Sequence, residues 1–168
     1  YDMFYGGADR FDWELVGKKE IFIPYNSYKL ETPGAKYKEI LTPGHLNPEY
    51  TRYELHRVWV VEAKKRDGIR HVYSRRVKYI DEDSWCISIS DRFDEQGNLW
   101  KCAMAYLANY WEIPATFKVT EAHHDLNSRR YNVAPLFNEE AIKSWQFHHP
   151  VPPDSHFTAT SIRRAGVR

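Results

Sequence analysis

The sequence predicts a mainly β protein, an antiparallel curved sheet or an incomplete β-barrel of long hairpins with one or two C-terminal helices. Two observations lead to this fold class. Aromatic residues make up 15% of the chain, and aromatic side chains favour the pleated, half-buried surface of a sheet. Several stretches also alternate polar and apolar residues and are separated by short turn motifs, which is typical of strands in hairpins.

Length and net charge limit the classes of protein to which this chain can belong. A chain of 168 residues predicts one domain. The net charge of +1 creates no bulk field that would favour nucleic acid. No run approaches the roughly 20 apolar residues of a membrane span. The chain opens at Tyr1 without a visible signal peptide. We therefore expect residues 1–168 to be the C-terminal portion of a single β-rich domain whose N-terminal part is missing.

Three long hairpins are predicted. Their strand pairs are 52–65 with 69–80, 85–93 with 98–111, and 117–125 with 128–135. The first hairpin turns at Asp67-Gly68, and its register stays open because a two-residue turn and a bulged turn both fit. In the second hairpin, a left-handed Gly97 predicts that Asp91 lies opposite Lys101.

The register of the second hairpin also separates the two cysteines. Cys86 and Cys102 would share one face but lie about four residues out of register. That offset corresponds to roughly 13 Å at the rise of a strand, which is beyond the reach of a disulfide. We therefore predict two partly buried thiols that are not bonded to each other.

The remaining segments carry weaker patterns. Residues 18–30 are predicted to form a strand interrupted by Pro24, which suggests an edge or a bulge. The proline- and glycine-rich residues 31–50 predict a long loop. Asn138 is predicted to cap a following helix. A second short helix is predicted at residues 161–164, before a glycine.

Two polar clusters are candidates for functional sites. Residues 81–83 (Asp-Glu-Asp) lack the spacing and central glycine of a calcium loop, so they are interpreted as a solvated turn. His123 and His124 are neighbours on a strand and would point to opposite faces. The sequence also contains no glycine-rich phosphate loop and no nucleophile elbow. It therefore predicts no catalytic residues, no metal ligands and no cofactor.

The candidate ligand-binding residues are six aromatic side chains and one arginine. They would line an apolar cavity inside a curved sheet, although an ordinary core is the simpler interpretation. An inward arginine could stack on a ring or bind an anionic head group, or it could lie exposed over aromatic surface. The candidates are Trp59, Tyr73, Arg75, Tyr79, Trp85, Trp100 and Tyr106. We expect Trp59 and Trp85 to be mostly buried, with Arg75 or Arg76 beside Trp59.

Four segments carry a resemblance to a known family. They are residues 10–13 (Arg-Phe-Asp-Trp), 17–26 (from Gly-Lys-Lys-Glu to Pro-Tyr-Asn), 52–63 (Arg-Tyr-Glu-Leu-His-Arg-Val-Trp-Val-Val-Glu-Ala) and 79–85 (Tyr-Ile-Asp-Glu-Asp-Ser-Trp). The chain resembles a bacterial family of unknown function whose members are often labelled outer-membrane lipoprotein-sorting proteins. The resemblance extends over essentially all of the chain, and the segment 52–63 is its most specific part.

The resemblance implies a relation to the lipoprotein carriers of the periplasm. Family members usually have a signal peptide and a longer N-terminal portion. The leading hypothesis is therefore a non-enzymatic carrier in the periplasm or at the outer membrane that binds a lipid, a lipoprotein or another apolar ligand. The alternative is a structural or interaction module that docks on an envelope transporter. A third hypothesis, a hydrolase using His56 or His123 with a nearby carboxylate, requires a nucleophile beside the base.

Overall fold

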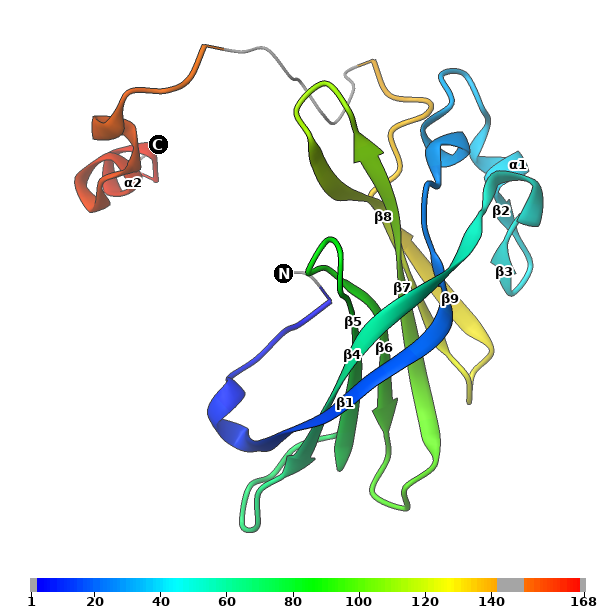
Figure 1. Ribbon diagram of the computed structural model, residues 1–168, viewed down its shortest axis with the longest axis vertical. Helices are drawn as coiled ribbons and strands as arrows, with labels where there is room; N and C mark the ends of the chain where they lie inside the picture. Colours follow the sequence, from blue (N-terminus) through cyan, green and yellow to red (C-terminus); the bar gives the residue numbers. More distant parts are fainter. Residues whose placement is uncertain (1–2, 142–149, 167–168) are drawn as a thin grey trace.

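The computed structural model, described here for residues 3–141 and 150–166, is built on a seven-stranded antiparallel open sheet (Figure 1). The strands lie in the order β1-β4-β5-β6-β7-β8-β9. Their bounds are β1 Phe11–Pro24, β4 Tyr53–Lys65, β5 Arg75–Asp81, β6 Ile87–Phe93, β7 Leu99–Tyr110, β8 Ala115–Asp125 and β9 Arg130–Ala134. The predicted mainly β, antiparallel fold is confirmed.

The helical elements are short. They are α1 Tyr37–Ile40, α2 Ala159–Ala165, and the 3₁₀ turns Ala8–Arg10, Tyr28–Glu31, Pro48–Tyr50 and Asp154–Phe157. The predicted C-terminal helix is confirmed as α2, where the side chain of Thr158 accepts a hydrogen bond from the Ser161 backbone. None of the helices in the described ranges is long and apolar enough to cross a membrane.

The edge strand β1 starts and ends differently from its prediction. It begins at Phe11, earlier than expected, and ends at Pro24. Its ladder with β4 shifts between Leu15 and Gly17, where Gly17 adopts φ +135°. Only β4 pairs with it, so the proline does lie on an edge strand, where the missing N–H costs the ladder nothing.

The first hairpin opens later than the turn signal suggested. Strand β4 matches its prediction, but β5 begins only at Arg75 because residues 66–74 form a loop. The ladder runs from Lys64 opposite Arg75 to Val58 opposite Asp81. The predicted return strand starting at residue 69 is therefore wrong by six residues.

The second hairpin contains a bulge that the sequence analysis missed. Its turn is as predicted, with Gly97 at φ +81° and Phe93 opposite Leu99. The next pair is Arg92 with Lys101, so Trp100 is an extra residue. As a result Asp91 lies opposite Cys102, and the predicted pairing of Asp91 with Lys101 is wrong.

The two cysteines remain separate despite this corrected register. The structure has no disulfide between Cys86 and Cys102. Burial, and after it the neighbouring carboxylate of Asp91, raise the pKa of the Cys102 thiol to about 12. We therefore expect Cys102 to be a slow nucleophile in the folded chain, because the thiolate is the reactive form.

Residues 28–50 form a cover, where the sequence had predicted a loop. Besides their helical turns they contain a small hairpin, β2 Leu41–Thr42 with β3 His45–Leu46. Their apolar side chains pack on β7 and β8, forming one cluster that includes Leu30, Ile40, Leu46, Tyr106 and Ala122. This segment therefore covers one apolar surface of the sheet.

The side chain of Asn138 has another role than the predicted cap. Its amide donates hydrogen bonds to the backbone carbonyls of Leu30, at 2.9 Å, and Thr32, at 3.1 Å. Residues 138 and 139 form a turn and residues 140 and 141 are bends, so the predicted helix does not start there. Its remaining residues, 142–145, lie outside the described residues. Asn138 thus ties the chain after β9 to the cover formed by residues 28–50.

A second cluster lies where the sheet curves back on itself. It joins Ile23 of β1, Val58 of β4 and Leu107 of β7. The backbone N–H of Ser27 donates to the carbonyl of Leu107 at 2.9 Å, which ties the end of β1 to a strand four places away in the sheet. In Figure 1, β1 and β4 run diagonally to the other strands, consistent with this curvature.

Candidate ligand-binding site

The predicted ligand residues do not converge on one cavity. Trp85 is 70% exposed and lies in the turn after β5, where its backbone N–H donates to the carbonyl of Asp81 at 2.9 Å. Its backbone is left-handed, with φ +59°. The predicted burial of Trp85 is wrong because residue 85 belongs to a turn, so its side chain does not enter the sheet.

Trp59 is half-buried and has a different cationic neighbour from the one expected. It lies opposite Ile80 on β5 and Lys18 on β1. The Nζ atom of Lys18 is 4.3 Å from the centre of the Trp59 ring. The predicted contact with Arg75 or Arg76 is therefore wrong, because the true register places the arginines at the far end of β5.

Three more of the predicted residues have separate surroundings: Arg75, Tyr79 and Tyr106. Arg75 is paired with Glu62 at 3.0 Å, and its guanidinium lies 3.6 Å from the centre of the Phe93 ring. Tyr79 is half-buried beside Asp91, and burial raises its pKa. Tyr106 is buried in the cluster under residues 28–50. Within the described residues, none of these three side chains forms a hydrogen bond, an ion pair or a ring contact with another of the predicted set.

Tyr73 and Trp100 are the predicted residues that the structure does bring together. Their ring centres lie 5.6 Å apart in an edge-to-face arrangement. The guanidinium of Arg76 lies 5.3 Å from the centre of the Tyr73 ring. Tyr73 therefore borders a polar site that the sequence did not indicate, and Trp100 packs against Tyr73.

That site contains two buried cations on β5. Arg76 is 5% exposed and Lys78 is 2% exposed. They share one face of the strand because alternate residues point the same way. Across the ladder, β6 places Arg92 opposite Arg76 and Ser90 opposite Lys78. A third cation thus adds to the positive charge at this place.

The chain before β1 closes this site. The Nζ of Lys78 donates to the carbonyl of Met3 at 2.8 Å and to the Ser90 hydroxyl at 2.7 Å. A guanidinium nitrogen of Arg76 donates to the carbonyl of Tyr5 at 3.3 Å. Residues 3–5 therefore lie over both cations, and their backbone carbonyls act as neutral acceptors.

Aromatic rings surround the Arg76 guanidinium. Its central carbon is 4.6 Å from the centre of the Phe11 ring and 5.5 Å from that of Phe4. One of its terminal nitrogens lies 3.0 Å from the Nε2 of His71. Its Nε is buried without a hydrogen-bond partner in the part of the chain that the structure describes. A buried donor of this kind is costly to leave unpaired.

The charges of the site are only partly compensated. Burial, and after it the positive charges of Arg92 and Arg76, lower the pKa of Lys78 from 10.5 to about 7. Burial and Arg92 also lower the pKa of Arg76. Within residues 3–141 and 150–166, no carboxylate forms an ion pair with Arg76 or Lys78. The polar groups that Arg76 and Lys78 bring to the site are thus hydrogen-bond donors.

The sequence contained a misleading signal for this site. Segment 75–81 has charged residues at two alternate positions, Arg76 and Lys78. This pattern predicts that their face of the strand is exposed to solvent. The structure buries this face because residues 3–5 fold back over it. That contact spans 75 residues for Lys78, so a reading of local alternation could not detect it.

The neighbouring histidines of β8, His123 and His124, make separate contacts. His123 lies on β8 with its Nε2 2.9 Å from a carboxylate oxygen of Glu121. His124 stacks on Tyr131, with ring centres 5.3 Å apart and planes inclined by 8°. The two imidazoles thus have separate partners, as their neighbouring positions on one strand predict.

The fold defines the class of protein as a mainly β domain with one curved antiparallel sheet. Residues 1–163 match the family described as "Protein of unknown function (DUF1329)". The chain belongs to this family, which confirms the resemblance carried by the four sequence segments.

One relative and two solved structures are similar to the chain. An uncharacterized protein of Pseudomonas aeruginosa is 45% identical over 168 residues, which are all of this chain and 36% of that protein. The chain thus spans about a third of that relative's length.

A crystal structure of a DUF1329 family protein from Desulfovibrio piger covers 91% of this chain and 47% of its own, with 11% identity and a TM-score of 0.45. A putative outer membrane lipoprotein-sorting protein domain from Vibrio parahaemolyticus covers 69% of this chain and 55% of its own, with 13% identity and a TM-score of 0.39.

Proposed function

We propose that this chain is part of a non-enzymatic binding or carrier protein for an amphipathic ligand with an acidic head group, such as a lipid or an acylated protein. The observation that supports the proposal is the pair of buried cations, Arg76 and Lys78. Moving a cation from water into a protein interior costs several kcal/mol unless it is paired. An acidic head group would supply the missing negative charge.

The present contacts of the cations are ones that a ligand can replace. The carbonyls of Met3 and Tyr5 accept hydrogen bonds from Lys78 and Arg76, and a carboxylate or phosphate oxygen could accept the same bonds. Bonds to an ionised acceptor are roughly twice as strong as those to a neutral one. Exchange would require residues 3–5 to move off the site.

The surroundings suit the apolar part of such a ligand. The rings of Phe4, Phe11 and Tyr73 lie around Arg76. Each buried methylene of an acyl chain gains about 0.8 kcal/mol. The proposal therefore assigns the head group to Arg76 and Lys78 and the first methylenes to these rings.

The proposed location is the periplasm or the outer membrane, and the proposed partner is a lipid or a lipoprotein. Both follow from the family resemblance in the sequence. A non-enzymatic role is proposed because the hydroxyl of Ser84, the serine near His56, donates to Asp81. A hydrolase would require that hydroxyl to donate to the imidazole.

Binding of chain-matched amphiphiles tests the proposal. Dodecanoate and dodecyl phosphate should bind the chain, measured by native mass spectrometry and calorimetry below the concentration at which they aggregate. Dodecanol, which has the same chain without the charge, should bind at least about tenfold more weakly, since a charge-assisted hydrogen bond contributes about 1.5–3 kcal/mol.

Lys78→Met isolates the head-group contact. This variant keeps the length of the side chain and removes its charge, so its affinity for dodecanoate should fall toward that for dodecanol while Arg76 stays in place. Lys64→Met is the matched control, because the side chain of Lys64 is 65% exposed. Equal affinity for the acid and the alcohol in the unmodified chain would refute the proposed head-group site.

A specific surface feature favours the alternative of a docking module. Phe22 on β1 lies opposite Leu55 on β4, and the two are 65% and 59% exposed. Such a pair fits the apolar surface of a partner protein, for which an envelope transporter is the candidate. Replacing both residues with serine should then abolish association with the transporter and leave dodecanoate binding unchanged.

A further inference from the structure

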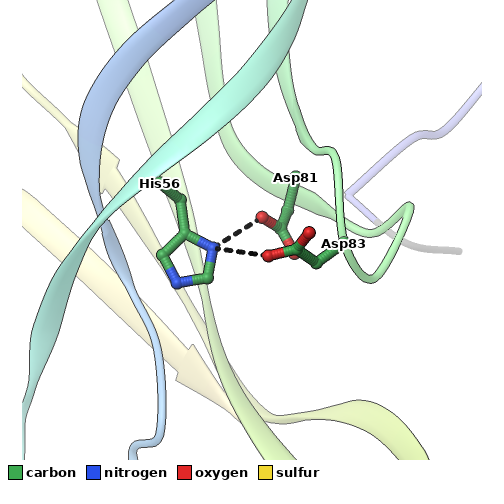
Figure 2. Close-up of side chains that lie close together, drawn as sticks. All are labelled: His56, Asp81 and Asp83. Atoms are coloured by element: carbon green, nitrogen blue, oxygen red, sulfur yellow. Dashed lines mark hydrogen bonds and ion pairs between the residues drawn. The ribbon is translucent and has the colours of Figure 1, made fainter.

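At the opposite end of β5 from the buried cations, an imidazole faces two carboxylates (Figure 2). The Nδ1 of His56 is 2.8 Å from an oxygen of Asp81 and 3.8 Å from an oxygen of Asp83. All three possible ligand atoms lie within 4.8 Å of one another. We propose that these three side chains bind a divalent transition-metal ion, with Zn²⁺ as the best match.

The elements that carry the three residues are firmly placed. His56 is the fourth residue of β4, and its ring packs against Tyr25 with centres 4.2 Å apart. Asp81 is the last residue of β5 and is fully buried. Asp83 follows in the turn, with its side chain 78% exposed. Two ligands are thus held by the sheet, while the third can adjust its position.

Hydrogen bonds orient the buried carboxylate. The backbone N–H and the hydroxyl of Ser84 both donate to one oxygen of Asp81, at 2.9 and 2.5 Å. The other oxygen of Asp81 is thereby turned toward the His56 ring. Outer contacts of this kind fix the orientation of metal-binding carboxylates.

The other nitrogen of the imidazole also faces a carboxylate. The Nε2 of His56 lies 3.8 Å from an oxygen of Glu54, and Glu54 is itself held by the amide of Asn26 at 2.7 Å. Metal-bound histidines commonly have a carboxylate beside the nitrogen that does not bind the metal. In the metal-bound state the proton of His56 would lie on Nε2, beside Glu54, and the Nδ1 lone pair would bind the ion.

Asp81 and Asp83 bring two negative charges to one imidazole, and a positive charge between them would offset these. Without an ion, the N–H of Nδ1 can donate a hydrogen bond to Asp81 across the observed 2.8 Å. With an ion, the Nδ1 lone pair and the carboxylate oxygens would bind it instead. No lysine or arginine within the described ranges forms an ion pair with Asp81 or Asp83. The neighbouring cations, Lys18 and Arg57, are paired with Glu82 instead, at 3.0 and 2.5 Å. A bound cation would supply the charge.

The donor set selects the class of ion. One imidazole nitrogen and two carboxylates suit Zn²⁺ and similar transition metals, whereas Ca²⁺ requires six to eight oxygens. Two atoms that each bind zinc at about 2.0 Å lie about 3.3 Å apart in a tetrahedron. The observed separations of 2.8 and 3.8 Å lie on either side of this value, so small shifts would complete the site.

The site has room for a fourth ligand. A pocket of about 200 Å³ adjoins it, lined by Leu55, His56, Arg57, Glu82 and Asp83. Water or an external group could reach the ion through this pocket. Three protein ligands with one open position are typical of accessible zinc sites, whereas a closed structural site has four.

Metal titration of the untagged chain, after removal of metal with EDTA, tests the proposal. Calorimetry should show one Zn²⁺ bound per chain, and the visible absorption of Co²⁺ should indicate nitrogen and oxygen ligands. Asp83→Asn should weaken Zn²⁺ binding about tenfold or more and should fold normally, because this side chain is exposed. Asp67→Asn, an exposed aspartate in another loop, is the matched control and should bind as the unmodified chain does.

A second variant makes the outcome decisive. His56→Gln should remove the nitrogen ligand from the Co²⁺ spectrum, and circular dichroism reports whether it folds. If it does not fold, Asp83→Asn alone decides. Zn²⁺ binding that is equal in Asp83→Asn and Asp67→Asn would overturn the proposal. So would an unmodified chain that takes up no Zn²⁺ at all.

Discussion

The two ends of β5 bury charges of opposite sign, and they are stabilised differently. At the C-terminal end, Asp81 accepts hydrogen bonds from Ser84 and lies 2.8 Å from the His56 ring. The buried cations are Arg76, near the N-terminal end, and Lys78, in the middle of the strand. Lys78 donates to the Met3 carbonyl and the Ser90 hydroxyl. Asp81 therefore faces a donor that can carry a charge, whereas Lys78 has only neutral acceptors.

This difference shows which buried charge of β5 obtains its partners from the sheet itself. The partners of Asp81 come from the adjacent strand β4 and from its own turn, so forming the sheet brings them together. One partner of Lys78 comes from residue 3, which lies outside the sheet. A network completed by the sheet favours stability, whereas a charge under a separate segment is suited to exchange with a ligand.

The largest expected effect is at the acidic end. Asp81→Ala should lower the free energy of unfolding by about 3–5 kcal/mol in metal-free protein, because it leaves buried partners unpaired. Urea denaturation measures this change. Asp83→Ala is the control and should change stability by less than about 0.5 kcal/mol, since the side chain is exposed. Equal effects of the two variants would contradict the buried network.

At the buried cations, a substitution is expected to raise the free energy of unfolding and not to lower it. Lys78→Met should raise the free energy of unfolding by about 1–4 kcal/mol, as replacements of buried charges by apolar residues of similar size often do. Urea denaturation of Lys78→Met and of Lys64→Met as a control gives the comparison. Destabilisation by Lys78→Met would mean that the bonds to Met3 and Ser90 already compensate the charge.

The pH dependence of stability sharpens the same comparison. The pKa of Lys78 is about 7 in the folded chain and near 10.5 when unfolded. Between these values the unfolded state binds more protons, so stability should rise with pH. The contribution is at most about 1.4 kcal/mol per pH unit, and below pH 7 it adds no slope.

Lys78→Met should lack this contribution. Urea denaturation at pH 7 and pH 9 should therefore show the unmodified chain gaining stability relative to the variant as pH rises. Parallel stability profiles of the two proteins would indicate that Lys78 keeps an ordinary pKa in the folded state.

The smallest effect is expected at Trp85. Trp85→Ala should change the free energy of unfolding by less than about 0.5 kcal/mol, because the ring is 70% exposed. Thermal or urea denaturation checks this. A loss above about 2 kcal/mol would show that the turn after β5 depends on aromatic packing and not only on the hydrogen bonds of Ser84 to Asp81.

Much of the fold could be predicted because the information is local. The alternation over residues 53–65 marks β4, Gly97 marks the turn between β6 and β7, and the hairpin of β8 and β9 follows the same rules. The predictions failed where one extra residue changes the register, as at Trp100, or where a loop is longer than its turn signal, as at residues 66–74. Single insertions of this kind leave no mark in hydrophobic alternation.

The polar sites could not be predicted because they depend on distant contacts. His56 and Asp81 are 25 residues apart, and they meet only in the register that the sequence left open. Read locally, residues 81–83 form an exposed acidic turn, and burial of Asp81 depends on the strands around it. Tyr73 and Trp100 were identified, but the cations beside them required the position of residues 3–5.

The long excursion between β1 and β4 has a consequence for folding kinetics. These strands form an antiparallel pair although residues 25–52 separate them, whereas β6 to β9 form hairpins with short turns. Closing a longer loop costs more chain entropy, and contacts between distant segments slow folding. We therefore expect the β6–β9 hairpins to be structured in the transition state, with φ-values above those of β1. Strand β1 and the cover of residues 28–50 would then dock late, and destabilising variants there should mainly speed unfolding.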